Sequence, residues 1–436
     1  MSLEKTQARI DNIRNAERTN KQYCRRIRIH DYLAGQAIYN LGDYPAKISA
    51  APTEYDRKLI SELAERGVQL IQVHEDWNDA ARYYGADKFN APDKQGMKDF
   101  VALCHSYGIK VIAYVSSGYF QETDPDFCED FTATDETLAM NYFKYRKGNH
   151  GNAAWREYII PKTIYVMEEY GFDGIFNDWG YDGYSVYGGM PEYDADLEDL
   201  LSILYSEVKK RGGIYKMHCD RNNQPPCRDK VYDYLWIGEW VENSPVGAGK
   251  DYVPYVVPCQ DRHRSDAEHL ETYLAKTIPF LQFPLLKTGR PIQGKNVDLP
   301  GVTYYGGDEQ EFYKQVGEYM DAHPDGPYVY SLWSSIPDDT DEWDVWTRYF
   351  KLYQPMVTEN SLAYIELREC DEICSALPDN VYASMFVNEQ TYLTVTNQGT
   401  EAYELKLQNR WTDRVTGQTA DCFTVEAGKI LFLVKE

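Results

Sequence analysis

The sequence predicts an α/β protein: a (β/α)8 TIM barrel followed by a small C-terminal antiparallel β-sandwich. Three observations predict it. Helical apolar stripes alternate with short apolar strands between residues 32 and 355, which leaves room for eight β/α units. These strands end in polar or acidic residues, as expected where barrel strands face a reaction site. After Pro355 the pattern changes to short alternating strands with glycine turns.

These patterns divide the chain into three parts. Residues 1–28 carry charges of both signs and predict a solvent-facing helix that leads into the barrel. Residues 29–355 form the predicted catalytic barrel, and 356–436 the β-sandwich. Four sandwich strands are expected, at residues 381–387, 390–396, 402–407 and 430–434.

The β/α units are clearest in the first half of the barrel. After a weak first strand at 32–40, helices ending at Gly67 and near Gly108 lead to strands at 68–73 and 109–115. Glycine is expected at these positions because it adopts the left-handed conformation that ends helices.

The most informative unit is the third. Its helix ends at Gly171 and leads to a strand that closes on Asn177, Asp178 and Trp179, while residues 121–152 precede it as an insertion on the same face.

The later units show the same order of helix and strand. A helix at 197–208 leads to a strand at 214–217, and another strand follows at 234–237. Candidate final strands lie at 278–286 and 328–333.

Composition excludes several classes of function. The formal charge of −24 and the pI near 4.8 argue against nucleic acid and anionic membranes, which need a basic surface. No apolar run approaches the ~18–20 residues of a spanning helix. Nine scattered cysteines without a C-x-x-C pair fit reduced thiols in a cytoplasm, and the polar N-terminus lacks a secretory signal. A chain beginning inside a longer protein would look the same, so secretion stays open, as does the oligomeric state.

The strand ends offer the residues for glycoside hydrolysis. That reaction needs two carboxyl groups, one to protonate the leaving oxygen and one to attack the sugar or activate water. Acidic residues also cap helices, so position alone does not make them catalytic. The candidates at predicted strand ends are Glu75, Asp76, Asp178, Asp220 and Glu239.

At this point the chain resembles a known family. Gly96-Met97-Lys98, His105-Ser106-Tyr107-Gly108 and the strand ending at Asp178 are similar to segments of the α-galactosidase group of retaining glycoside hydrolases. The resemblance covers about residues 55–245 and departs from the family at two positions. Phe176 stands where the family has a lysine, and Glu239 where it has an aspartate.

The resemblance implies roles for individual residues. Asp178 would be the nucleophile and Glu239, after the sixth strand, the general acid/base of a retaining α-glycosidase acting on oligosaccharides or glycosides. His218 and Asp220 would contact substrate. From the residues themselves, further substrate contacts are predicted near the strand ends, with ordinary packing as the alternative for the aromatic ones: Asp76, Trp77, Tyr119, Asn177, Trp179, Trp240 and Trp333.

Two other classes of function remain open. A barrel that binds glycan without cutting it would use the same aromatic residues. A metal-dependent hydrolase would use close pairs such as His74 and Asp76, Cys104 and His105, or His218 and Asp220. The chain has only eight histidines and no H-x-x-x-H pair, so no metal and no cofactor are predicted. The expected partner is a carbohydrate substrate.

Overall fold

The computed structural model describes residues 3–20, 25–41, 49–74, 77, 89–121, 124–133, 138–140, 143–178, 191–218, 231–237, 255–258, 267–290, 318, 322, 341–368 and 370–436. It divides into two compact units. One comprises Gln36–Ile237 and Leu285–Asp338, and the other comprises Met1–Gly35, Gly238–Pro284 and Asp339–Glu436.

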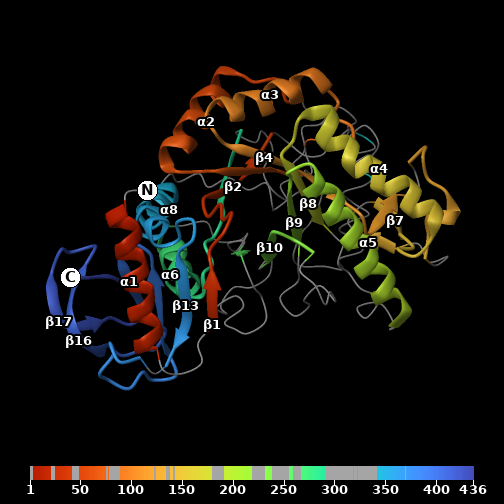
Figure 1. Cartoon of the computed structure of the whole chain (residues 1–436). Helices are drawn as coiled ribbons and strands as arrows, with labels where there is room; N and C mark the ends of the chain where they lie inside the picture. The colour runs from red at the N-terminus through yellow and green to blue at the C-terminus, as the bar shows by residue number, and fades with distance from the viewer. Residues whose placement is uncertain are drawn as a thin grey trace. The chain divides into compact units, whose positions relative to one another are not determined.

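The barrel sheet has eight strands in the order β11-β10-β9-β8-β4-β3-β2-β12 (Figure 1), and all of them except β11 belong to the first unit. From β10 to β12 all neighbours pair in parallel. The last strand lies beside the first, as in a barrel, so the predicted fold class is confirmed. The strands are β2 (Gln36–Asn40), β3 (Leu70–Val73), β4 (Lys110–Ser116), β8 (Gly174–Asp178), β9 (Ile214–His218), β10 (Tyr234–Ile237), β11 (Val256–Pro258) and β12 (Leu286–Gly289).

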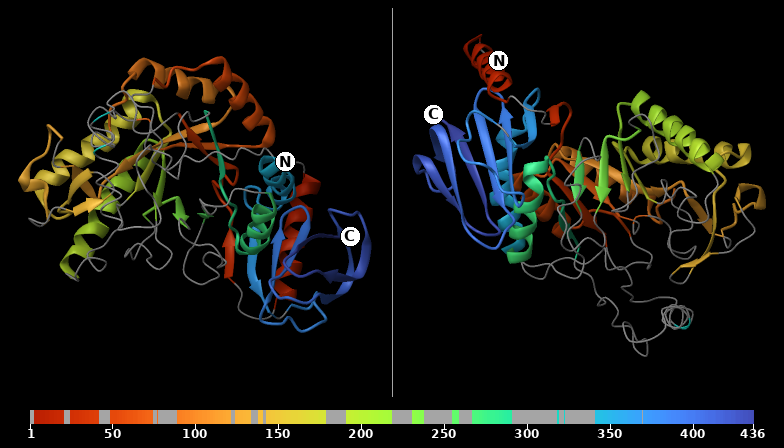
Figure 2. Two further views of the ribbon diagram at one scale, coloured as in Figure 1. Left: turned by 180° about the vertical axis from the view of Figure 1, so that it is seen from behind. Right: turned by 90° about the horizontal axis from the view of Figure 1, so that it is seen from below.

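Helices on the outer side of this sheet connect the strands (Figures 1 and 2). Gly67 and Gly171 have φ of 101° and 76° and end α2 and α4, as the sequence predicted. Side chains of Thr53 and Asn152 cap the first turns of the same two helices. The helices are α2 (Glu54–Arg66), α3 (Lys94–Ser106), α4 (Ala153–Tyr170) and α5 (Pro191–Lys210).

Alternation along the strands gives the sheet two different faces. Tyr215 on β9 packs edge-on against Tyr205 on α5, with ring centroids 6.1 Å apart, so its face is covered by helices. The next residue, Lys216, donates from Nζ to Oε1 of Gln36 at 3.1 Å. Because β9 and β2 are not neighbours in the sheet, this bond crosses the barrel interior and identifies the inner face.

One late barrel strand was predicted wrongly. Residues 278–286 do not form a continuous strand: α6 (Ala267–Thr277) passes into a 3-10 helix, Ile278–Phe280, and β12 begins only at Leu286. Pro279 and Pro284 lack the N–H that a strand ladder needs, which explains the difference. The other candidate, 328–333, lies outside the described residues.

The second unit contains a seven-stranded antiparallel sheet with the order β1-β13-β14-β15-β18-β16-β17 (Figure 2). All four predicted strands are present, whereas β1, β13 and β17 had no sequence prediction. The C-terminal antiparallel domain is therefore confirmed. The strands are β1 (Arg25–Arg28), β13 (Leu362–Leu367), β14 (Val381–Val387), β15 (Thr391–Asn397), β16 (Tyr403–Asp413), β17 (Thr419–Val425) and β18 (Ile430–Lys435).

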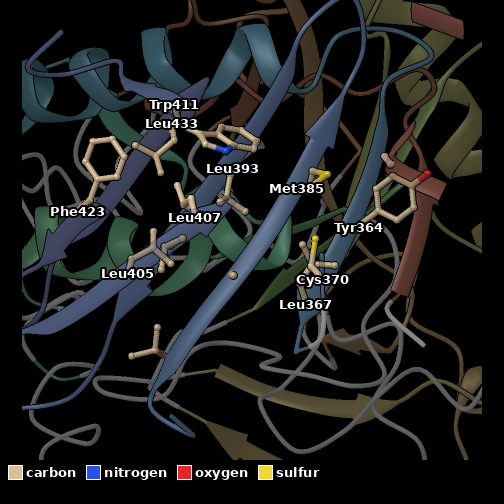
Figure 3. Close-up of a cluster of buried hydrophobic side chains, with 14 of the residues drawn as sticks. Tyr364, Leu367, Cys370, Met385, Leu393, Leu405, Leu407, Trp411, Phe423 and Leu433 are labelled. Atoms are coloured by element: carbon tan, nitrogen blue, oxygen red, sulfur yellow. The ribbon is translucent and has the colours of Figure 1, made fainter. Parts of the chain in front are cut away.

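The core of this unit lies on one face of the sheet (Figure 3). Tyr364 on β13 and Phe423 on β17 belong to the same buried cluster, although their strands are far apart in the sheet order. The sheet therefore curls around one core. Its other face packs on helical residues: Tyr353 of α8 (Asp341–Tyr353) has its ring centroid 6.4 Å from that of Phe386.

The N-terminal segment differs from its prediction. Instead of one helix that leads into the barrel, the described residues of this segment form α1 (Leu3–Thr19) and β1. Strand β1 pairs with β13, and Ala16 of α1 belongs to the core of the C-terminal sheet. No helix in the described part of the chain has the length and apolar character needed to cross a membrane.

Candidate active site

The site forms where β4, β8 and β9 end. Asp178 is the last residue of β8 and lies in register with Ser116, the last residue of β4. Phe176, two residues earlier, lies in register with Lys216, so Phe176 and Asp178 share the inner face of the barrel. The barrel thus places Asp178 at the carboxyl end of its fourth strand, where barrel enzymes have their reaction sites.

Gly174 allows the strand that carries Asp178 to pack this closely. A Cβ on Gly174 would lie 1.9 Å from the carbonyl oxygen of Ile214 on β9. Glycine at this position therefore permits the close approach of β8 and β9 that brings Asp178 next to His218.

Both oxygens of the Asp178 carboxylate accept hydrogen bonds. Tyr114 donates its hydroxyl to Oδ2 at 2.5 Å, and Nδ1 of His218 lies 2.6 Å from Oδ1. The side chains of Asp178 and His218 are each 12 % exposed, so the pair is largely enclosed but is not sealed from solvent.

These neighbours keep Asp178 ionised. Burial raises the pKa of Asp178, but the charge of His218, hydrogen bonds from His218 and Tyr114, and the charge of His74 act against it. The net result is a pKa below the ordinary carboxyl value. A buried carboxylate that stays charged is the state that a nucleophile or an electrostatic stabiliser requires.

Aromatic rings surround this pair. The His218 ring lies 4.6 Å from Trp236 and 6.3 Å from Phe176, centroid to centroid. The His74 ring meets Tyr114 edge-on at 5.2 Å. The charged group therefore has apolar walls, which strengthen its electrostatic interactions by excluding water.

Asn177 lies on the other face of β8. Its side chain is fully buried and bonds to Ser117 and to the hydroxyl of Tyr215 rather than facing the barrel interior. Its predicted contact with substrate does not fit this orientation, because neighbouring residues of a strand point to opposite faces.

Trp77 is a packing residue in this structure. It is 1 % exposed, its Nε1 donates to the carbonyl of Tyr114 at 2.7 Å, and its ring meets Tyr170 and Phe172 at 5.5 Å each. No face of the indole is open to a sugar. Tyr119, 6 % exposed, begins β5 (Tyr119–Gln121) just beyond the end of β4.

The structure thus brings together Asp178 and His218 from the predicted set. The remaining predicted site residues lie outside the described residues: Glu239, Asp76, Trp179, Asp220, Trp240 and Trp333.

Two residues of the site had no sequence prediction. Tyr114 lies in a strand that is apolar on both faces. The sequence therefore has no alternation of polar and apolar residues that would indicate an inward-pointing hydroxyl. Lys216 was detectable, since a lysine inside the apolar run 214–217 is unusual. The structure places it 1 % exposed, with Nζ 5.8 Å from the Phe176 ring centroid.

Of the residue pairs that a metal-dependent hydrolase would use, Cys104 and His105 both lie within the described residues. Cys104 is fully buried, whereas His105 bonds through Nε2 to Asp173 at 2.7 Å, so these neighbours face different surroundings. Within the described residues, one group of three side chains has ligand atoms close together: His30, Asp31 and Glu359. All three are exposed.

No family model matches the chain, and no curated protein is similar to it in sequence. Similar solved structures include a maltogenic α-amylase from Thermotoga neapolitana, with TM-score 0.56, 15% identity and coverage of 92% of this chain and 99% of that one. An α-amylase from Geobacillus thermoleovorans complexed with acarbose has a TM-score of 0.57 and 11% identity, and the match covers 93% of this chain and 100% of that one. A trehalose-6-phosphate hydrolase from Bacillus licheniformis has a TM-score of 0.53 and 11% identity, and the match covers 93% of this chain and 100% of that one.

These likenesses bear on the fold. These three proteins are two α-amylases and a trehalose-6-phosphate hydrolase, so the narrower resemblance to α-galactosidases is not confirmed. At 11–15% identity, the likeness shows that the chain has the fold of α-amylases, a (β/α)8 barrel with a C-terminal β domain.

Proposed function

We propose that the protein is a retaining α-glycosidase that acts on oligosaccharides and that Asp178 is its nucleophile. One observation carries the proposal: the Asp178 carboxylate stands at the carboxyl end of the fourth barrel strand, held by hydrogen bonds between His218 and Tyr114. The pKa of Asp178 below its ordinary value keeps the group charged, as attack on a sugar requires.

The reaction proceeds in two steps. An oxygen of Asp178 bonds to the anomeric carbon while a carboxylic acid protonates the leaving oxygen and the C–O bond breaks. The acid group is a carboxylate after the first step, and it now removes a proton from water. That water displaces Asp178 from the anomeric carbon and releases the sugar with its original configuration. Hydrogen bonds from Tyr114 and His218 hold the two Asp178 oxygens in a fixed orientation for this attack.

Glu239 is the proposed acid/base. It follows β10, the sixth strand of the barrel, and lies outside the described residues. Retention predicts about 5–5.5 Å between the carboxyl groups of Asp178 and Glu239, whereas inversion needs about 6.5–9.5 Å. We expect Glu239→Gln to lose the hydrolysis of substrates with poor leaving groups first, because they depend most on protonation.

The substrate is proposed to be an α-linked hexose. The similar structures include a maltogenic α-amylase, an acarbose complex and a trehalose-6-phosphate hydrolase, while the sequence motifs resemble α-galactosidases. Aryl α-glucosides and α-galactosides should therefore be tested first, with the β-anomers beside them.

The test compares two carboxylates of the same β/α unit. Asp178→Asn should abolish turnover and keep the fold. Asp173→Asn is the matched control: Asp173 precedes β8, at the other end of the strand, and bonds to His105 and to the backbone N–H of Val111. We expect Asp173→Asn to stay active.

Other outcomes assign other functions. Activity that survives Asp178→Asn contradicts the nucleophile. Sugars that raise the melting temperature without chromophore release by the wild type indicate a glycan-binding barrel. Loss of wild-type activity with a chelator indicates a metal-dependent hydrolase.

A further inference from the structure

Asn177 uses its whole carboxamide to connect neighbouring parts of the barrel. Its Oδ1 accepts from the backbone N–H of Ser117 at 3.0 Å, and its Nδ2 donates to Ser117 Oγ at 2.8 Å and to the Tyr215 hydroxyl at 2.7 Å. Asn177 is 0 % exposed and Ser117 1 % exposed. Removal of the carboxamide would remove both hydrogen bonds from the buried Ser117, which is costly.

Ser117 is the first residue of a segment that leaves the barrel beside Asp178. We call residues 117–152, between β4 and α4, the third-strand insertion. Within it, β5 pairs with β7 (Phe143–Lys147), and β6 (Leu138–Met140) pairs with the other side of β7. The insertion therefore has a small antiparallel sheet of its own.

The two ends of the third-strand insertion meet next to Ser117. The N–H of Gly148 donates to the carbonyl of Gly118 at 3.0 Å, and Thr132 forms a bridge with Gly148. A Cβ on Gly148 would lie 2.6 Å from the Trp155 ring, so this end is also packed closely against α4. Hydrogen bonds to Ser117 thus act on the base of the whole insertion.

Two adjacent residues of β8 therefore act on opposite faces of the sheet. Asp178 points into the barrel toward the reacting sugar, and Asn177 points away and holds Ser117, one residue beyond Ser116, the register partner of Asp178. We propose that Asn177 is a positioning residue that fixes the third-strand insertion relative to Asp178. The inference rests on the proposed glycosidase function and concerns how the enzyme binds substrates longer than one sugar ring.

This role predicts a division between long and short substrates. The insertion begins one residue beyond Ser116, the register partner of Asp178. In this proposal it contacts the rings of an oligosaccharide beyond the one that Asp178 attacks, so its displacement weakens binding of those rings. A small aryl glycoside depends chiefly on the attacked ring. Loss of the Asn177 bonds should therefore raise KM for oligosaccharides and leave kcat for aryl glycosides nearly unchanged.

The experiment uses the full chain with three variants. Asn177→Ala removes every bond of the carboxamide, and Ser117→Ala removes one of its two bonds to the insertion. Tyr215→Phe, the control, removes the bond to β9 and keeps both bonds to Ser117. Amide hydrogen exchange is measured at residues 117–121 and 143–148. It should be about tenfold faster in Asn177→Ala, the effect of at least one lost hydrogen bond, and unchanged in Tyr215→Phe.

Kinetics complete the test. We expect Asn177→Ala to raise KM for an oligosaccharide several-fold, Ser117→Ala to do so less, and Tyr215→Phe to match the wild type. If Asn177→Ala does not fold, the smaller change in Ser117→Ala decides. Unchanged exchange at the insertion overturns the proposal, as does a loss of kcat on aryl glycosides with KM unaltered. A wild type without glycosidase activity refutes the proposed function separately, while exchange still tests the positioning role.

Discussion

At the scale of single residues, Asp178 is subject to opposing influences. Burial raises its pKa, and three neighbouring side chains lower it: His218 on β9 by charge and a hydrogen bond, Tyr114 on β4 by a hydrogen bond, and His74, just after β3, by charge. The pKa of Asp178 therefore depends on its neighbours more than on its own position. Side chains that lie 40, 64 and 104 residues from Asp178 in the sequence therefore act on the charge of this one carboxylate.

His218 offers the first prediction. Replacement by leucine removes a hydrogen bond and a nearby charge and leaves burial, which raises the pKa of Asp178. We expect the acid limb of kcat/KM to move to higher pH by about 1–3 units in His218→Leu. His218→Asn, which keeps an N–H donor near Oδ1, should move it less. A pH profile of kcat/KM on an aryl glycoside measures the shift, and an acid limb that stays in place in His218→Leu contradicts this account.

At the scale of elements, Asp56 connects the first helix of the barrel to its last strand. Arg290, directly after β12, binds both oxygens of Asp56 at 2.9 Å, and Tyr39 donates its hydroxyl to Oδ1 at 2.6 Å. The backbone N–H of Thr53 also donates to Oδ2 of Asp56, at 2.7 Å. The carboxylate is fully buried and saturated with donors.

Removal of the Asp56 charge should destabilise this unit. We expect Asp56→Asn to lower the free energy of unfolding by about 3–5 kcal/mol, because it leaves Arg290 partly buried without its partner. Chemical denaturation measures the loss. Glu62→Gln, which weakens the partly exposed pair between Glu62 and Arg66 within α2, is the control, with an expected change of about 0–1 kcal/mol. Equal effects of the two substitutions would contradict the assigned role.

The same carboxylate predicts a pH dependence of stability. Burial raises the pKa of Asp56, but the hydrogen bonds of Arg290, Tyr39 and Thr53 outweigh it, and the net pKa lies below 3.8. The folded state therefore binds the proton less readily than the unfolded state. This stabilisation is fully present above the unfolded pKa and is lost as pH falls through the folded value. Denaturation midpoints of wild type and Asp56→Asn should converge on acidification, and a constant difference would contradict the coupling.

Gly174 gives a prediction about strand packing. A methyl group there would meet the backbone of Ile214, which cannot rotate away as a side chain can. We expect Gly174→Ala to cost about 1–3 kcal/mol and to reduce activity by moving Asp178 relative to His218. Gly212→Ala is an instructive comparison, since its Cβ meets nothing within 4 Å and only its φ of 69° opposes the change. Full activity in Gly174→Ala would show that β8 and β9 can separate without consequence for the site.

At the scale of the whole molecule, the two ends of the chain share one sheet. Four residue pairs join β1 to β13, and Arg9 of α1 forms an ion pair with Glu389 at 2.8 Å. Without β1, the edge of β13 would be exposed to solvent and open to pairing with other chains.

Deletion of residues 3–28 should therefore affect the C-terminal unit. We expect its free energy of unfolding to fall by at least about 2 kcal/mol, since backbone hydrogen bonds contribute about 1 kcal/mol each. Deletion of residues 3–7 alone, which are exposed, should change little. Calorimetry and light scattering measure stability and aggregation, and an undisturbed C-terminal transition after the longer deletion would contradict the pairing.

The sequence predicted the barrel well because its signals are local. Gly67 and Gly171 end helices by a conformation that other residues rarely adopt, and the apolar strands follow directly. The pairing of β1 with β13 depends on residues more than 300 positions apart, so no local pattern indicated it. Asp178 was identified by its position at a strand end. The sequence did not indicate that Tyr114 bonds to Asp178 or that Asn177 points outward, because both depend on the register between strands.

The identity of the group that bonds to the sugar is the most direct test of the proposed function. A fluorinated glycosyl fluoride of the cleaved sugar slows hydrolysis of the glycosyl-enzyme, so the covalent intermediate accumulates and peptide mass spectrometry can locate it. We predict one added glycosyl group on the peptide that contains Asp178, and none in Asp178→Asn. A label on another carboxylate, or an inverted first product with no label, would contradict the assignment of Asp178 as nucleophile.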